Sequence, residues 1–183
     1  MRVPRTFCFV DLSGFTNFTA AHGDDAAARL LSSFRMAARE VTSDRGVRVA
    51  KWLGDGCMIV SIEQSDAIAA ALDIEHRAEE LCAPLSVRVG IASGYALLFE
   101  GDDYIGSAVN LAARLCDATG ANEVLIPADQ VEELPEGVES HPYGWLELRG
   151  FPAPIQAVEL SGRAAPLPRN DTGELWTRSP FVP

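Results

Sequence analysis

The sequence predicts an α+β fold of the ferredoxin-like βαββαβ plan, with helices packed on an antiparallel sheet and further αβ elements added at the C-terminal end. Three observations predict it. Apolar residues occupy both faces of a run at 6–12, which is typical of a buried central strand. Two β-rich runs flank the turn Gly54-Asp55-Gly56, which indicates a hairpin. Stretches with helical periodicity separate these strands from each other and from a Val/Ile-rich run at 86–92.

The first strand and the first helix follow from local composition. The strand stops at Asp11, and Gly14 lets the backbone turn tightly just after it. Between residues 24 and 44 the apolar positions recur at i, i+3, i+4 and i+7, with Asp24 or Asp25 available to cap the first turn. We therefore expect an amphipathic helix of about six turns that lies on the sheet.

The hairpin is expected to join strands at 47–53 and 57–62. Regular alternation along the first of these strands places Lys51 on the same face as Val47 and Val49. The later elements follow in order: a helix over 65–82 that stops at Pro84, a strand over 86–92 that exits at Gly94, a polar link over 100–106, a helix that ends near Gly120, strands near 123–126, 143–149 and 155–160, and a short helix near 127–133.

Length and composition indicate one domain followed by a tail. The 183 residues suffice for one full core, which we place at 1–162, with a Pro-containing C-terminal tail at 163–183. Four prolines fall in the last 18 residues, so the tail is expected to be extended, either mobile or held on the domain through Trp176 and Phe181. We expect no sensory segment ahead of the first strand, which starts close to the N-terminus.

Charge and composition argue against several functions. Acidic residues outnumber basic ones by 26 to 15, for a formal net charge of −11, whereas a nucleic-acid surface needs a basic patch. No apolar run approaches the roughly 20 residues that span a bilayer, and there is no signal-peptide pattern, so we expect a cytoplasmic protein. The four cysteines form no CxxC pair and are expected to be reduced core residues. The three histidines lack the spacing of metal ligands.

Two isolated carboxylates are the first candidates for a functional site. Asp11 ends the first strand and Asp55, 44 residues later, sits in the hairpin turn, so pairing of these strands would bring both acids to one edge of the sheet. Mg²⁺ typically takes one or two protein carboxylates together with substrate phosphates, and two such ions suit an in-line displacement at phosphorus. The structural alternative is that Asp11 caps the following turn and that Asp55 makes an Asx-turn.

The turn after Asp11 can bind phosphates. Backbone N–H groups from Ser13 through Gly14 and Phe15 to Thr16 lead into a helical turn, and such groups cradle anions. Because the chain is itself acidic, an anionic substrate needs metal ions to offset repulsion. We therefore expect Gly14, Phe15 and Thr16 to contact substrate phosphates.

The helix that follows Gly106 carries a polar pair, Asn110 and Arg114, four residues apart on one face. Their neighbours are nearly all apolar, so we expect a partly buried environment. An arginine there suits charge that develops on a transferred phosphate, and an asparagine suits a sugar hydroxyl. The alternative is an exposed polar pair on a surface helix.

Three segments resemble, in order, the signature segments of class III nucleotidyl cyclases: Phe9-Val10-Asp11-Leu12-Ser13-Gly14-Phe15-Thr16, Lys51-x-x-Gly54-Asp55-Gly56 and Asp103-x-x-Gly106-x-x-Val109-Asn110-x-Ala112-x-Arg114. The resemblance runs from about residue 5 to 160. It implies that Asp11 and Asp55 hold two divalent cations, Mg²⁺ or Mn²⁺, assisted by the backbone carbonyl of Leu12. It also implies that Asn110 orients the ribose and that Arg114 stabilises the transition state.

The resemblance assigns base recognition to Lys51 and Asp103. Adenine presents a ring-nitrogen acceptor beside an amine donor, which a lysine donor and an aspartate acceptor match, whereas guanine presents the opposite polarity. This pair therefore favours ATP over GTP. Taken alone, Lys51 is an ordinary strand lysine.

The resemblance also implies a head-to-tail homodimer with two shared sites. Each site takes Asp11 and Asp55 from one chain and the remaining four residues, Lys51, Asp103, Asn110 and Arg114, from the other. An extended strand puts Lys51 and Asp55 about 13 Å apart, which is compatible with this division. The connection from Gly94 to Asp103 is short, like the short form in other bacterial members.

The expected function is conversion of ATP to cyclic AMP and pyrophosphate. The alternatives are a guanylyl cyclase and a non-catalytic nucleotide-binding or dimerisation module. A diguanylate cyclase would need a Gly-Gly-acidic-Glu-Phe turn, which Gly54-Asp55-Gly56 is not. No lysine matches the family's second triphosphate-binding residue, which leaves weaker triphosphate contacts or a contact from Arg149.

Overall fold

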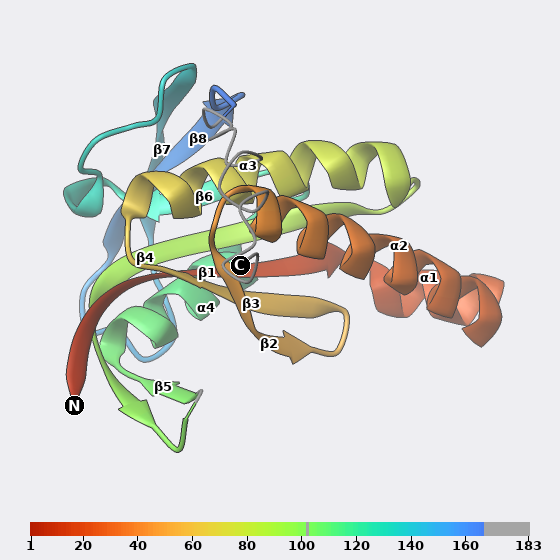
Figure 1. Ribbon diagram of the computed structural model, residues 1–183, viewed down its shortest axis with the longest axis horizontal. Helices are drawn as coiled ribbons and strands as arrows, with labels where there is room; N and C mark the ends of the chain where they lie inside the picture. Colours follow the sequence, from red (N-terminus) through yellow and green to blue (C-terminus); the bar gives the residue numbers. More distant parts are fainter. Residues whose placement is uncertain (102, 167–183) are drawn as a thin grey trace, which may run out of the picture.

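The computed structural model describes residues 1–101 and 103–166, and its sheet is built around β1 (Arg2–Ser13). Antiparallel partners flank β1 on both sides, namely β3 (Gly56–Ser61) and β4 (Ser86–Phe99). The edge strand β2 (Arg48–Leu53) pairs with β3. The resulting order β2-β3-β1-β4 is that of the ferredoxin-like plan, so the predicted fold class is confirmed (Figure 1).

Further strands extend the sheet beyond β4. β6 (Val124–Pro127) runs parallel to β4, and it is followed by β8 (Ile155–Gly162) and then β7 (Val138–Leu146) at the edge. The predicted αβ additions are therefore present. The helix expected near 127–133 is only a three-residue 3₁₀ turn, η1 (Ala128–Gln130).

Helices cover both faces of the sheet because side chains along β1 alternate between two buried clusters. On one face, Cys8 and Val10 pack in a cluster with residues of α2 (Asp24–Asp44) and α3 (Gln64–Leu81). On the other, Phe7 packs in a cluster with residues of α4 (Ser107–Ala118). The short α1 (Phe15–His22) follows β1 directly. Helix α2 is capped by Gly23, without a side-chain cap bond, so neither Asp24 nor Asp25 is its cap.

A β-bulge in β2 changes the side on which Lys51 lies. Val49 pairs with Ile59, whereas Lys51 pairs with the next residue back along β3, Met58. The extra residue, Ala50, shifts the alternation by one position. Lys51 therefore lies on the α4 face, and the prediction that it shares a face with Val49 is wrong.

Strand β4 does not end at Gly94. It continues to Phe99 and folds back as a hairpin onto β5 (Asp103–Ile105), where the sequence predicted a polar link (Figure 1). Gly94 serves helix packing instead, because a Cβ atom there would lie 3.0 Å from the Cβ of Ala108 in α4. The hairpin carries Asp103 back alongside the sheet.

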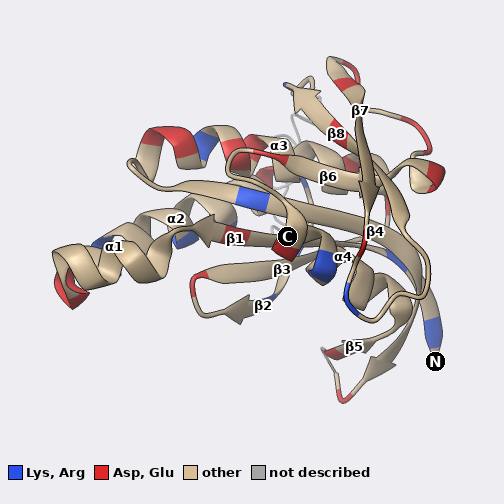
Figure 2. Ribbon diagram, turned by 180° about the vertical axis from the view of Figure 1, so that it is seen from behind, with Lys and Arg blue, Asp and Glu red and all other residues tan. Residues whose placement is uncertain are grey.

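The first residues after β8 still contact the domain. Arg45 of α2's C-terminal end is 8% exposed and donates to the carbonyl oxygens of Ala164 and Ala165. The division of domain and tail at residue 162 stays a prediction, and Trp176 and Phe181 lie outside the described residues. No described helix is both long and apolar enough to cross a membrane. Figure 2 shows basic positions dispersed among acidic ones along the described ribbon.

Candidate active site

The paired strands β1 and β3 bring Asp11 next to the turn that holds Asp55. Asp11 lies opposite Gly56 in the β1–β3 register, and the backbone N–H of Leu12 donates to the Asp55 carbonyl at 3.4 Å. Gly56 permits this approach, because a Cβ there would lie 2.5 Å from the Val10 carbonyl oxygen and 3.0 Å from Asp11 Oδ1. The two acids thus lie at one end of the sheet, as the strand pattern predicted.

The electrostatics of this pair suit a cation. Burial raises the pKa of Asp55, and the negative charge of Asp11 raises it further. Within the described residues, no group of three or more His, Cys, Asp or Glu side chains is placed to hold a metal. Two carboxylates without a third His, Cys, Asp or Glu side chain fit Mg²⁺ or Mn²⁺, which complete their shell with water and phosphate oxygens. Helix α1 has Gly14 at its N-cap and no side-chain cap bond, so Asp11 does not cap it.

Arg88 in β4 is a site residue that the sequence reasoning missed. Its Nη2 and Nε donate to Asp11 Oδ2 at 2.7 and 3.0 Å, and its Nη1 donates to the Asp117 carbonyl at 3.2 Å. The signal was present, because Arg88 interrupts a Val/Ile-rich strand with a charge. By contrast, Arg149 is exposed and lines a different cavity, with Glu147 and Phe151.

A cavity of about 350 Å³ opens beside Asp11 and Arg88. Asp117 and the thiols of Cys57 and Cys116 also line it. Burial raises the pKa of each of these two thiols to about 12. Both cysteines are therefore neutral packing residues, and all four cysteines of the chain are free and buried, as predicted.

The turn after β1 offers backbone donors at the same end of the sheet. Gly14 has a left-handed backbone with φ +82°, and helix α1 begins at the next residue, Phe15. The first N–H groups of a helix have no partner within it, so those of Phe15 and Thr16 are available to an anion. These groups follow Asp11 by only a few residues.

Lys51 and Asp103 meet although 52 residues separate them. Lys51 Nζ lies 2.6 Å from Asp103 Oδ1, and each side chain is 52% exposed. The bulge at Ala50 and the β4–β5 hairpin together create this contact, because they bring both residues to the same face. One donor and one acceptor thus stand side by side in contact with solvent.

Asn110 and Arg114 lie on α4, and both are exposed in the single chain. The prediction of a partly buried environment is therefore wrong for one protomer. Arg114 Nη1 lies 2.7 Å from Asp117 Oδ2, one turn further along the helix. Helix α4 lies close on β4, because a Cβ at Gly90 would come within 2.2 Å of the Cys116 nitrogen.

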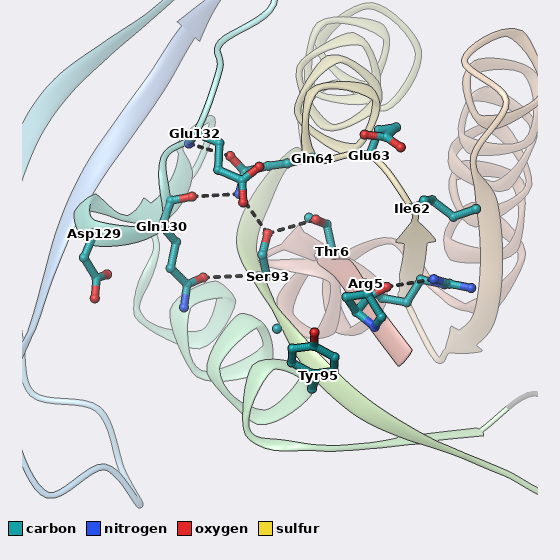
Figure 3. A pocket seen from close by; sticks show the side chains of 12 residues that line it. Arg5, Thr6, Ile62, Glu63, Gln64, Ser93, Tyr95, Asp129, Gln130 and Glu132 are labelled. Atoms are coloured by element: carbon teal, nitrogen blue, oxygen red, sulfur yellow. Dashed lines mark hydrogen bonds between the residues drawn. The ribbon is translucent and has the colours of Figure 1, made fainter. Parts of the chain in front are cut away.

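A second cavity, of about 380 Å³, lies further back along β1 (Figure 3). Its polar lining is hydrogen-bonded internally: Gln64 Nε2 donates to the Gln130 carbonyl and to Ser93 Oγ, each at 2.8 Å. Ser93 Oγ also lies 2.8 Å from Thr6 Oγ1. Thr6 and Asp11 are five residues apart on one strand, about 16 Å. This cavity is therefore separate from the carboxylate pair.

The strand order, the carboxylate pair at the sheet end and the polar residues of α4 define a nucleotidyl cyclase catalytic domain. The comparison with protein families agrees: the model of the adenylate and guanylate cyclase catalytic domain matches residues 4–161. The chain belongs to this family.

Bacterial relatives share the domain. An uncharacterised protein of Mycobacterium tuberculosis is 38% identical over 152 residues, which cover 83% of this chain and 40% of that protein. An adenylate cyclase of Streptomyces coelicolor is 33% identical over 127 residues, covering 69% of this chain and 33% of that enzyme. The chain spans less than half the length of these curated relatives.

Solved structures share the fold. The adenylyl cyclase CyaB from P. aeruginosa superposes with a TM-score of 0.79 at 25% identity, covering 92% of this chain and 98% of that one. The guanylate cyclase domain of RhGC from Catenaria anguillulae, solved in complex with GTP, gives 0.78 at 18% identity over 89% and 99% of the two chains. At that identity the second likeness bears on the fold alone.

Proposed function

We propose that the domain is an adenylyl cyclase that converts ATP to 3′,5′-cyclic AMP and pyrophosphate. The observation that carries the proposal is the 2.6 Å contact between Lys51 and Asp103. A lysine donor next to an aspartate acceptor complements the ring nitrogen and the amine of adenine, and it opposes the donor and acceptor that guanine presents. A guanylyl cyclase would need the reverse polarity at this pair.

Asp11 and Asp55, with the backbone carbonyl of Leu12, would hold two Mg²⁺ or Mn²⁺ ions. Such ions activate the 3′-hydroxyl and offset the charge of the phosphates when they are bound. Burial and the neighbouring charge of Asp11 raise the pKa of Asp55, and bound cations would offset the repulsion between the two carboxylates.

The triphosphate would be held by Arg88 and by the turn at Gly14, Phe15 and Thr16. Arg88 donates to a carboxylate oxygen, Asp11 Oδ2, at 2.7 Å. If Asp11 binds cations instead, the guanidinium of Arg88 becomes available to phosphate oxygens, because a guanidinium pairs with phosphate as well as with carboxylate. The backbone N–H groups at the start of α1 add uncharged donors.

In the reaction, the 3′-oxygen attacks the α-phosphorus as its proton leaves, and the bond from that phosphorus to the oxygen bridging to the β-phosphate breaks. Asn110 orients the ribose so that the attack is in line. Arg114 donates to the α-phosphate as charge develops on it, which is the moment at which such a contact accelerates the step.

The site would be shared between two chains arranged head to tail. Asn110 and Arg114 are exposed on α4 in the single chain, so a substrate held by a partner would be accessible to both once Arg114 leaves its ion pair with Asp117. Asp11 and Asp55 would come from one protomer, and Lys51, Asp103, Asn110 and Arg114 from the other. A lone chain would then be nearly inactive.

Subunit mixing tests the enzyme and the shared site together. Asp55→Ala and Arg114→Ala are each expected to abolish cyclic AMP formation from Mn²⁺ and ATP. An equal mixture should recover about one quarter of wild-type activity, because half the dimers are mixed and each of these has one intact site. Asp11→Ala mixed with Asp55→Ala is the control and should recover nothing.

Two outcomes of the mixing experiment would contradict the proposal. If the wild type makes no cyclic AMP at concentrations that permit dimers, the domain is the non-catalytic alternative. If the wild type is active but the first mixture stays inactive, each site is formed within one chain.

A further inference from the structure

The indole of Trp52 in β2 lies against two arginines of α2. The guanidinium carbon of Arg35 lies 5.2 Å from the ring centroid and that of Arg39 lies 5.1 Å from it. Both distances are within the range of cation–π attraction. The Trp52 side chain is therefore one of the contacts that attach the edge hairpin β2–β3 to α2.

Arg35 reaches beyond the ring to the turn that carries Asp55. Its Nη2 donates to the carbonyl oxygen of Gly54 at 3.2 Å. Gly54 has φ +64°, a conformation that glycine adopts more readily than other residues, and it immediately precedes Asp55. Arg35 thus fixes the peptide that leads into the candidate metal ligand.

The guanidinium of Arg35 is held at some energetic cost. Its Nε is buried and has no hydrogen-bond partner among the described residues. A buried donor without a partner is destabilising, so the contacts with Trp52 and Gly54 are what hold this guanidinium in place.

The two candidate metal ligands differ in how firmly their backbones are held. Asp11 lies on β1, which is paired with β4 along its length and with β3 from Thr6 to Asp11. Asp55 lies in the turn of a hairpin whose outer strand is the edge of the sheet. Besides the bond from the Leu12 N–H to the Asp55 carbonyl, the turn is held by the contact of its Gly54 carbonyl with Arg35 of α2.

We infer that Arg35 is a positioning residue that holds the Gly54-Asp55 turn in the geometry that binds metal. This rests on the proposed function, in which Asp55 is a metal ligand. Mg²⁺ and Mn²⁺ have short, narrowly defined bonds to oxygen, so a small displacement of one carboxylate weakens binding. None of the three motif segments includes Arg35.

The test compares Arg35→Met with Arg39→Met. Each variant removes one guanidinium from the Trp52 ring and keeps an apolar stem, but only Arg35→Met removes the bond to Gly54. Mn²⁺ alone is titrated into each protein, and the free ion is followed by electron paramagnetic resonance. We expect Arg35→Met to raise the Kd for Mn²⁺ about tenfold, which corresponds to the loss of one charged hydrogen bond. The Kd of Arg39→Met should stay within about twofold of the wild-type value.

Activity and stability separate positioning from general damage. The Tm should fall by a similar amount in Arg35→Met and in Arg39→Met. In Arg35→Met the Mn²⁺ concentration for half-maximal cyclic AMP formation should rise, while kcat at saturating Mn²⁺ stays near the wild-type value. If Arg35→Met does not fold, Arg35→Lys and Arg39→Lys replace the pair, and the first is expected to bind Mn²⁺ more weakly than the second.

Equal Mn²⁺ affinity within either matched pair would overturn the inference, and so would a wild type that binds no Mn²⁺. The expected Mn²⁺ affinities in a protein that makes no cyclic AMP would support the inference while refuting the proposed reaction. The two failures are therefore distinguishable.

Discussion

Replacing Lys51 and Asp103, the pair proposed to bind the base, should change nucleotide preference without disturbing the fold. The double variant Lys51→Glu with Asp103→Gly replaces the donor by an acceptor and removes the acceptor opposite it. Both side chains are 52% exposed, so their ion pair contributes no more than about 1 kcal/mol to the free energy of unfolding. The variant is therefore expected to fold like the wild type.

The effect on selectivity should be much larger than the effect on stability. A hydrogen bond to a charged group contributes about 1.5 to 3 kcal/mol, and two such bonds to adenine would be lost together. The sum of about 3 to 6 kcal/mol corresponds to a factor of roughly 10² to 10⁴. A glutamate introduced at position 51 would accept hydrogen bonds from the ring N–H and the amine of guanine, so catalytic efficiency with GTP should rise.

The assay is kcat/KM for ATP and for GTP at saturating Mn²⁺. We expect the wild type to prefer ATP and the double variant to lose that preference or reverse it. Arg77→Glu with Glu40→Ala is the control, because it alters an exposed pair between α3 and α2 and changes net charge by the same amount. An unchanged ATP-to-GTP ratio in an active Lys51→Glu, Asp103→Gly variant would refute the assignment of base recognition to this pair.

Three further predictions follow from the site and the core. Arg88→Met should tighten binding of Mn²⁺ alone about fivefold, because the guanidinium paired with Asp11 is gone. The same variant should bind a non-hydrolysable ATP analogue about tenfold more weakly. Calorimetry in which both affinities change in the same direction would contradict this prediction. Cys57 and Cys116, with pKa values raised to about 12, should resist iodoacetamide at about pH 8 until urea unfolds the chain, and mass spectrometry showing early alkylation would disprove their burial. Burial raises the pKa of Glu75, so the free energy of unfolding falls as the pH rises from the ordinary pKa of a glutamate through the raised pKa. Glu75→Gln should therefore raise the urea midpoint at neutral pH, and this gain should vanish near pH 4. An equal gain at both pH values would exclude this cause.

The parts of the fold that were predictable from sequence are those fixed by local chemistry. The apolar run before Asp11 predicted a central strand, and the glycines around Asp55 predicted the hairpin turn. The strand pairing that follows from them is enough to bring the two acids together. Periodicity predicted α2 because its buried face is continuous over the whole helix.

Glycines misled the prediction for β4, because a glycine required by packing resembles a glycine that ends a strand. Gly94 predicts the end of the strand, but in the structure it lets Ala108 of α4 pack closely on β4. Gly90 admits the backbone of the same helix near Cys116. The reason for each glycine is a contact with a distant segment, which the local sequence does not contain.

The bulge in β2 had a sequence signal. The apolar positions run Val47, Val49 and then Trp52, so the alternation slips by one residue at Ala50. Arg88 had only the weaker signal of one charge in an apolar strand. Its partner, Asp11, is identified by the β1–β4 register, in which the two residues stand opposite each other. Such pairings depend on the assembled sheet.

The bulge explains how one short hairpin can serve two purposes. Without the extra residue, Lys51 would follow Val49 onto the face covered by α2 and α3, away from Asp103. With it, Lys51 reaches the α4 face while Asp55 remains at the turn beside Asp11. In the proposed head-to-tail dimer these two residues serve different active sites, although they are only four positions apart in one hairpin. Any displacement of the hairpin against α2 would then alter metal binding in one site and base binding in the other, so the two sites of a dimer should respond together to changes at Trp52.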